Sequence, residues 1–428
     1  MLRFAVTRLR TAASAGAQST GFALQSRKTS LFSPKRLRFY GSNALDVDPV
    51  SHQMINYAID HARSQKSDES YAQGLLVLEQ CLSSNLRDGA DTSRGMVLLA
   101  MSTLLSERGN IDEAIEKLET IQDFSNSSLG VKVAAMEGLV GLNLELGKDD
   151  TSSVLADKCL QLFRSSESET ENCPDGGVLE ARAKAGKGLV ELVLGNIESA
   201  GSYFGESDDN ESFSGNVALS YGQYLHATGK FSLAKLFYQK AIRGVSETRP
   251  FVDPFALSTC NMLPEEVLLG ATCALGQLEA HGGNFGDAEE ILTRALKEAE
   301  ERFGLHHPKV GIVLTCIALM YRHKAKLERS SSLLIQEGLY RKATDLLKSP
   351  PLDSKECKVH RRDITALARG GYADILCVQQ NRKGEGEQLR KWAETLWGNG
   401  RLSLTEALEL SDPSSKVPVI DARISRVL

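Results

Sequence analysis

The sequence predicts an all-α chain, folded as a solenoid of about eight antiparallel helix pairs and containing no sheet. Two observations on composition predict this fold class: hydrophobic residues make up 42% of the 428-residue chain, and aromatic residues make up only 6%. The third observation is that small residues recur with a period of about 34 residues, which is typical of stacked supersecondary units. The hydrophobic content is that of a globular protein, so a long core can be buried.

The stretch GNVALSYGQYLHATGKFSLAKLFYQKAIRG, residues 215–244, shows the repeat most clearly. Aligning it with the stretch one period earlier, or with the later stretch 269–298, places glycine on glycine and alanine on alanine. The stretch 269–298 follows the stretch 215–244 by one repeat period plus an insertion. The matched small residues are Gly188, Gly195 and Ala200, then Gly222, Gly229 and Ala234, then Gly276, Gly283 and Ala288.

Each small residue has a structural role in a helix pair. We expect a first helix over 215–228 and a second over 231–243. Gly222 and Ala234 then let the two antiparallel helices approach closely. Gly229 forms the turn, because glycine accepts the left-handed conformation in which many helices end. These roles account for the pattern without an active site.

The pattern resembles the tetratricopeptide repeat, in which small residues recur at one position of the first helix and two of the second. The resemblance covers about residues 95–348 and is strongest over 181–206, 215–244 and 269–298. It implies a right-handed α-solenoid. The stretch ALKEAEERFGLHHPKVGIVLTCIALMYRHKAKLERSSSLL, from Ala295, is similar to the longer variant of this repeat found in kinesin light chains.

The resemblance also implies a concave groove, lined by the first helix of each pair, that binds a peptide or helix of a partner protein. By position, the candidate groove residues are Asn216, Leu219, Gln223, His226, Cys273 and Gln277. The family's carboxylate clamp, which captures chaperone C-termini, needs lysine and asparagine at the places held here by Leu219 and Gln223. Clamp-type chaperone binding is therefore disfavoured.

Residues 1–40 differ in composition from the rest of the chain. They contain eight basic residues and no acid, and the first acidic residue is Asp46. An arginine-rich, acid-poor segment without a long apolar run is typical of an organellar transit peptide. The end of the segment, RLRFYGSNA, resembles a mitochondrial processing site that is cut between Tyr40 and Gly41. We expect import into the mitochondrial matrix, with the chloroplast as the alternative. A second interpretation of residues 1–40 is a basic tail that binds nucleic acid or anionic lipid.

Three regions follow from these observations. Residues 1–40 are the predicted, disordered mitochondrial transit peptide. Residues 41–348 form the repeat array. Residues 349–428 form a C-terminal helical pair, which caps the array, and a tail.

The charge balance favours protein partners over nucleic acid. Without the eight basic residues of the leader, 42 basic residues stand against 55 acidic ones, a net charge of about −13. Nucleic-acid binding depends on neutralising phosphates, which such a chain does not favour. No apolar run approaches the ~20 residues that span a bilayer.

The sequence predicts no catalytic, cofactor or metal site. The eight cysteines lie far apart, and Cys316, His323 and the neighbouring His306 and His307 do not give a four-ligand zinc spacing. The stretch AKAGKGLV (183–190) lacks the Ser or Thr of a phosphate-binding loop and lies within a predicted helix.

These observations predict a non-enzymatic scaffold or adaptor that binds a partner's peptide or subunit in an organelle. One alternative is an organellar RNA-binding repeat protein, which would need basic residues in the groove. A second is an assembly factor for a multi-subunit complex, and a third is an enzyme built on a solenoid, which would need a pocket of converging charged residues.

The predicted leader can be tested on the protein purified from its organelle. N-terminal sequencing should begin within a few residues of Gly41, because Arg38 stands where the processing pattern requires an arginine. A precursor carrying Arg38→Ala should be cut poorly at this bond. A mature protein that retains Arg3 would contradict the prediction.

Overall fold

A computed structural model gives the structure of the protein. It describes residues 48–84, 91–165, 176–205, 215–247, 257–350, 360–409 and 416–428. The predicted transit peptide and its cleavage site at Tyr40 and Gly41 lie outside the described residues.

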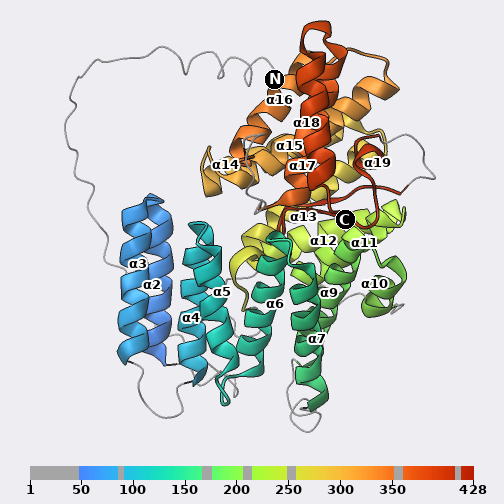
Figure 1. Cartoon of the computed structure of the whole chain (residues 1–428). Coiled ribbons are helices and arrows are strands. Elements are labelled where there is room, and N and C mark those ends of the chain that lie inside the picture. The colour runs from blue at the N-terminus through green and yellow to red at the C-terminus, as the bar shows by residue number, and fades with distance from the viewer. Residues whose placement is uncertain are drawn as a thin grey trace, which may run out of the picture. The chain divides into compact units, whose positions relative to one another are not determined.

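Seventeen α-helices lie in the described part of the chain, and sixteen of them form eight consecutive pairs (Figure 1). The eight pairs are α2 (Pro49–Gln65) with α3 (Asp68–Ser84), α4 (Asp91–Glu107) with α5 (Ile111–Gln122), α6 (Leu129–Glu145) with α7 (Asp149–Ser165), α9 (Gly176–Leu194) with α10 (Ile197–Phe204), α11 (Gly215–Ala227) with α12 (Phe231–Glu247), α13 (Pro264–His281) with α14 (Phe285–Phe303), α15 (Pro308–Leu327) with α16 (Leu333–Leu346), and α17 (Arg362–Val378) with α18 (Lys383–Leu396). The short α19 (Leu404–Leu408) follows. The predicted all-α solenoid of eight helix pairs is confirmed.

The first helices of the pairs form a continuous layer. Each packs on its own second helix, and each also contacts the first helix of the next pair, from α2 through to α17. The second helices are amphipathic: α14 buries one stripe, Phe285, Ala288, Leu292, Ala295 and Ala299, at helical spacing. In contrast, nearly every residue of α6 is buried. The first helices after α2 are therefore also covered on the face that points away from the second helix of the same pair, whereas α2 buries only one stripe.

Glycines allow the two helices of a pair to cross closely. A side chain added at Gly222 would come within 2.8 Å of the ring of Tyr238, which lies on the second helix of the same pair. Ala234 is fully buried. The equivalent close approaches are Gly188 to Phe204 and Gly276 to Leu292.

The turn inside a pair has one geometry in five of the pairs. The turn glycines are Gly109, Gly147, Gly195, Gly229 and Gly283, with φ between 73° and 85°. In each, the residue after the glycine donates its backbone N–H to a carbonyl in the last turn of the first helix, as Lys230 does to Leu225 at 2.8 Å. This is a Schellman ending, which favours glycine because only glycine adopts positive φ without strain.

The prediction of no sheet was wrong in one place. Residues 416–428, called here the tail segment, fold as a small hairpin in which β1 (Ile420–Asp421) pairs antiparallel with β2 (Arg426–Val427). The segment is rich in Val and Ile, which favour extended backbone. It lies in the core rather than at the surface: residues 417–428 are all buried, and Figure 1 shows the C-terminal end of the sequence among the helices.

The tail segment is shared between two hydrophobic clusters. Ile420, Ala422 and Val427 belong to the cluster built from α13 to α19. Val419, Ile424 and Leu428 belong to the cluster built mainly from α6, α9 and α11.

No helix in the described ranges is long and apolar enough to cross a membrane.

The close crossing of α11 and α12 at Gly222 predicts that Gly222→Leu lowers the stability of the protein. The added side chain would meet the ring of Tyr238, and overpacking of this kind costs ~1–3 kcal/mol. We expect a lower thermal midpoint by circular dichroism. Gly286→Leu is the matched control, because a side chain added there meets nothing within 4 Å. An unchanged midpoint for Gly222→Leu would contradict the assigned helix crossing.

Candidate functional site

The face of the first helices that points away from their partners is the candidate site, called here the inner face. It carries the residues that the sequence selected as groove residues. Leu219, Gln223, His226 and Cys273 have no exposed surface, and Gln277 is 6% exposed. Asn216, at the start of α11, is half-buried. Asn216, Gln223 and Gln277 are covered by the tail segment, and Leu219, His226 and Cys273 are covered by neighbouring helices.

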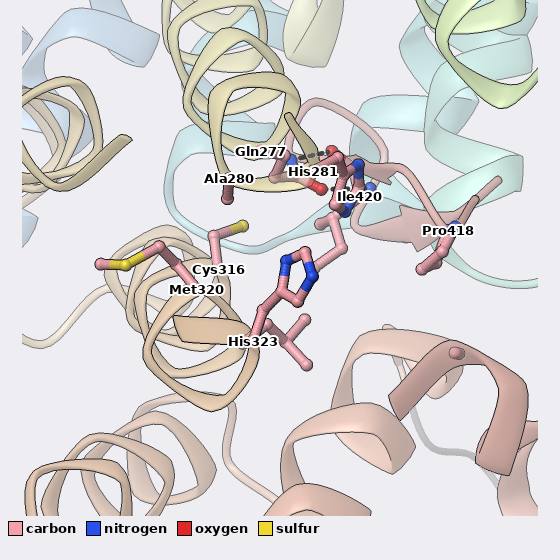
Figure 2. A pocket seen from close by; sticks show the side chains of 10 residues that line it. Gln277, Ala280, His281, Cys316, Met320, His323, Pro418 and Ile420 are labelled. Atoms are coloured by element: carbon pink, nitrogen blue, oxygen red, sulfur yellow. Dashed lines mark hydrogen bonds between the residues drawn. The ribbon is translucent and has the colours of Figure 1, made fainter. Parts of the chain in front are cut away.

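Two side chains of the inner face hold the backbone of the tail segment. The Gln277 amide oxygen accepts a hydrogen bond from the Ile420 N–H (2.8 Å), and its NH2 group donates to the Ile420 carbonyl (3.0 Å). Figure 2 shows this pair beside Pro418. The Lys309 ammonium donates to the carbonyls of Ala422 (2.7 Å) and Arg423 (2.6 Å). These contacts depend on backbone conformation and not on side-chain identity.

The first of two arginine sites lies on α11, and we call it the Arg423 site. The guanidinium of Arg423 donates to Asn216 Oδ1 (2.8 Å), Ser220 Oγ (3.2 Å) and Gln223 Oε1 (3.0 Å). These three residues are spaced by four and three, so they share one face of the helix. Asp421 of the tail segment supplies the carboxylate, at 2.8 Å. The side chain of Arg423 is fully buried.

The second site, the Arg426 site, is acidic. Arg426 donates to both carboxylate oxygens of Asp149 (2.6 and 3.0 Å), to Asp363 (2.6 Å) and to the Leu144 carbonyl (2.9 Å). Burial opposes the charge on Arg426, but the hydrogen bonds and charges of Asp149 and Asp363 outweigh it and raise the Arg426 pKa. Bidentate pairing of this kind is among the strongest hydrogen bonding in proteins.

A third arginine, Arg401, holds the two ends of the tail segment together. It donates to the carbonyls of Val417 and Leu428, and more distantly (3.5 Å) to that of Ala227. Burial lowers the Arg401 pKa to about 10. Asn399 donates to the Val427 carbonyl. The loop after α18 thus contacts the tail segment at Val417, Val427 and Leu428.

Residues 257–263 cover the inner face nearer its N-terminal end. The hydroxyl of Thr259 donates to the Leu99 carbonyl (3.0 Å) and lies 2.9 Å from the hydroxyls of Ser102 and Thr103. Gly138 on α6 leaves room for this segment, since a Cβ there would lie 2.5 Å from the Thr259 methyl. Residues 257–263 and the tail segment together contact the inner-face helices from α4 to α17.

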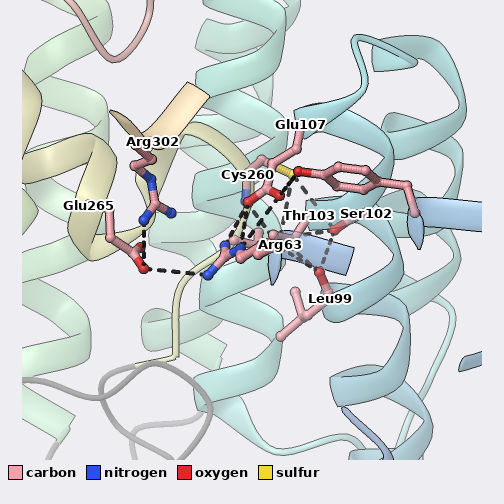
Figure 3. A network of polar contacts seen from close by, with 10 residues as sticks. Arg63, Leu99, Ser102, Thr103, Glu107, Cys260, Glu265 and Arg302 are labelled. Carbon is pink, nitrogen blue, oxygen red and sulfur yellow. Dashed lines mark hydrogen bonds and ion pairs between the residues drawn. The ribbon is translucent and has the colours of Figure 1, made fainter. Parts of the chain in front are cut away.

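An ion-pair network joins the first helix pair to the sixth (Figure 3). Arg63 of α2 pairs with Glu107 (2.6 Å) and with Glu265 of α13 (3.4 Å), and Glu265 also pairs with Arg302 (3.2 Å). Burial, followed by the Glu107 charge, raises the pKa of Tyr71, whose hydroxyl donates to Glu107 (3.0 Å). The network pairs each of its carboxylates with an arginine and joins distant repeats.

Three histidines line up beside the tail segment. His226 Nε2 lies 2.8 Å from His281 Nδ1, and His226 Nδ1 lies 3.0 Å from the Tyr238 hydroxyl. His281 and His323 border a small cavity of about 20 Å³ that Ile420 also lines (Figure 2). Burial lowers the pKa of His281 to about 3 and that of His226 well below its usual value. Both imidazoles are therefore neutral at neutral pH and act in packing.

The described residues offer no reactive centre of the common kinds. No group of three His, Cys, Asp or Glu side chains among them could hold a metal ion. Burial raises the thiol pKa of Cys159 to about 12 and that of Cys260 to about 11, and a hydrogen bond to Cys316 together with burial raises that of Cys273. Protonated, buried thiols are poor nucleophiles. The arrangement is suited to binding.

Only some of the groove residues predicted from the sequence contact the tail segment. Asn216, Gln223 and Gln277 contact the tail segment directly. His226 faces His281 and Tyr238, and Cys273 faces Cys316. Sequence reasoning missed the tail segment and its acidic receptors entirely. The available signal was VPVIDARISRVL, a run of β-branched residues with two arginines at the end of an otherwise helical chain.

The chain was compared with protein families, curated proteins and solved structures. No protein-family model matches the chain, and no curated protein matches it. The chain is similar to a tetratricopeptide repeat protein from Parabacteroides merdae ATCC 43184, with a TM-score of 0.36 and 11% sequence identity, over 80% of this chain and 99% of that one. Similarity at this level carries no information about a ligand.

The contacts of the Arg426 site predict that Arg426→Met strongly lowers the free energy of unfolding. The substitution leaves Asp149 and Asp363 facing an apolar side chain, and removing one partner of a buried ion pair costs ~3–5 kcal/mol. We expect a clearly lower unfolding midpoint in denaturant.

The matched control is Arg390→Met on α18, whose arginine is 46% exposed and pairs with Asp374; exposed pairs contribute ~0–1 kcal/mol. Adding Asp363→Asn to Arg426→Met should recover part of the loss, because it removes one uncompensated charge. Equal effects of the two arginine substitutions would contradict the assigned site.

Proposed function

We propose that the protein is a non-enzymatic interaction scaffold whose inner face binds a segment of another protein. The observation that carries the proposal is the way this face holds the tail segment. Gln277, Lys309 and Arg401 direct their hydrogen bonds at backbone groups of residues 417–428. Receptors that contact the backbone of an extended segment gain affinity from it and leave specificity to side-chain sites.

A binding role accounts for the ionisable groups of the inner face better than catalysis does. Asp149 and Asp363 are engaged by Arg426, and Glu266 by Lys309 at 3.1 Å. The buried imidazoles are neutral and the buried thiols protonated. A catalytic acid or base needs a pKa near the working pH and access to substrate.

The chemistry of the inner face also favours protein over RNA. The two arginines that lie deepest on it, Arg423 and Arg426, belong to the tail segment. The receptor groups around them are the amides of Asn216 and Gln223 and the carboxylates of Asp149 and Asp363. The two carboxylates would repel phosphates. An assembly factor for a multi-subunit complex is a more specific form of the same proposal.

We propose the mitochondrial matrix as the compartment, with the chloroplast as the alternative. The support is the composition of residues 1–40 and the processing pattern at Tyr40 and Gly41.

Peptide binding can be tested on the complete chain with a specific protease site inserted between Glu409 and Lys416. After cleavage, a fluorescent peptide of residues 416–428 should exchange with the bound tail segment, giving saturable binding by fluorescence anisotropy below the unfolding temperature. Gln277→Ala should weaken binding by about tenfold or more, because two hydrogen bonds are lost.

Gln239→Ala, at an exposed position of α12, is the matched control and should leave the affinity unchanged. Exchange that occurs only when the whole protein unfolds would contradict the proposed function.

A further inference from the structure

We propose that the inner face selects partner segments carrying two arginines at the spacing of Arg423 and Arg426, and that the tail segment is an imperfect internal occupant which such a segment displaces. The inference rests on the proposed function, since it names the partner of the same site. It is carried by the two arginine sites and by buried polar atoms that the tail segment leaves unsatisfied.

The two sites require arginine and not merely positive charge. Arg423 reaches three acceptors on α11, and Arg426 forms a fork on both oxygens of Asp149 while also reaching Asp363. A planar guanidinium with five donors matches such sets of acceptors, whereas a lysine ammonium is a point charge with three. Lysine would leave acceptors unpaired at both sites.

The spacing of the two arginines is set by the hairpin. Asp421 pairs with Arg426 across the ladder, so residues 422–425 form the connection between strands. Arg423 lies within that connection and faces α11, and Arg426 lies on the returning strand and faces α7 and α17. One additional residue between them would move one guanidinium away from its acceptors.

The tail segment satisfies the site incompletely. Ser425 has a φ of 57°, in the left-handed region, and its buried hydroxyl has no hydrogen-bond partner in the part of the chain described. On the receptor side, Gln223 Nε2 and Asp363 Oδ1 are likewise buried and without a partner there. Buried polar atoms without partners are costly, and a serine with positive φ is strained. A segment with glycine in place of Ser425 would fit better.

Tethering explains how an imperfect segment can hold the site. A segment attached to its receptor through a short linker has an effective concentration in the millimolar range. A partner must therefore bind more tightly than the tail segment or be locally abundant. The acidic receptor groups favour a cationic segment electrostatically. The inner face would then stay closed until a matching partner arrives.

The test uses the cleaved protein described above and five labelled peptides of residues 416–428. The peptides are the natural sequence, Ser425→Gly, Arg426→Lys, a form with one alanine inserted after Arg423, and a scrambled peptide of the same composition. Relative to the natural peptide, we expect Ser425→Gly to bind about threefold more tightly and Arg426→Lys to bind at least about tenfold more weakly. The respaced and scrambled peptides should not bind measurably.

The outcomes separate the two proposals. If the natural peptide fails to bind, the proposed function falls together with this inference. If it binds but the lysine or respaced peptide binds equally well, arginine selection is wrong and peptide binding stands. In the uncut chain, the Ser425→Gly peptide at high concentration should compete with the tail segment, and protection of the Ile420 amide from hydrogen exchange should fall. Retained protection at saturating peptide would show that the tail segment is a fixed part of the core, and would overturn the inference.

Discussion

The burial of two guanidinium groups on the inner face is the interaction on which the filled state of that face depends. Moving a charge out of water costs several kcal/mol unless acids and hydrogen bonds replace the lost hydration. Arg423 and Arg426 obtain them from α6, α7, α11 and α17 and from Asp421. Helices far apart in sequence must therefore converge on one short segment, and this fixes the shape of the inner face.

This constraint explains an asymmetry between the two layers of the solenoid. The second helices face solvent and bury one stripe, as α14 does. The first helices after α2, such as α6, bury most of their residues, because the tail segment and residues 257–263 lie on them; α2 buries only one stripe. A binding face that is filled in its resting state differs from an open groove. Its apparent affinity for a partner depends on the difference in binding free energy between the partner segment and the tail segment. Specificity then depends both on how well the partner segment fits the inner face and on how poorly the tail segment fits it.

The fold could be predicted from the sequence because its causes are local. Gly222 meets Tyr238 within a single helix pair, and Gly229 forms a turn within the same unit, so the repeat period carries both. The tail segment has no such signal, since Arg426 and Asp149 are 277 residues apart. Position within the repeat selected Asn216, Gln223 and Gln277, which lie against the tail segment, but position could not reveal that the chain itself covers them.

Hydrogen–deuterium exchange of the intact, unmodified protein tests the central claim most directly. The amides of Ile420 and Leu428 are bonded to Gln277 and Val419, and those of α13 are bonded within the helix beneath them. If the tail segment is a displaceable occupant, its amides should exchange through local opening, with a lower free energy than the α13 amides and little dependence on denaturant. Equal protection of the tail segment and α13, with the same steep denaturant dependence, would show that both open only in global unfolding and would contradict the account.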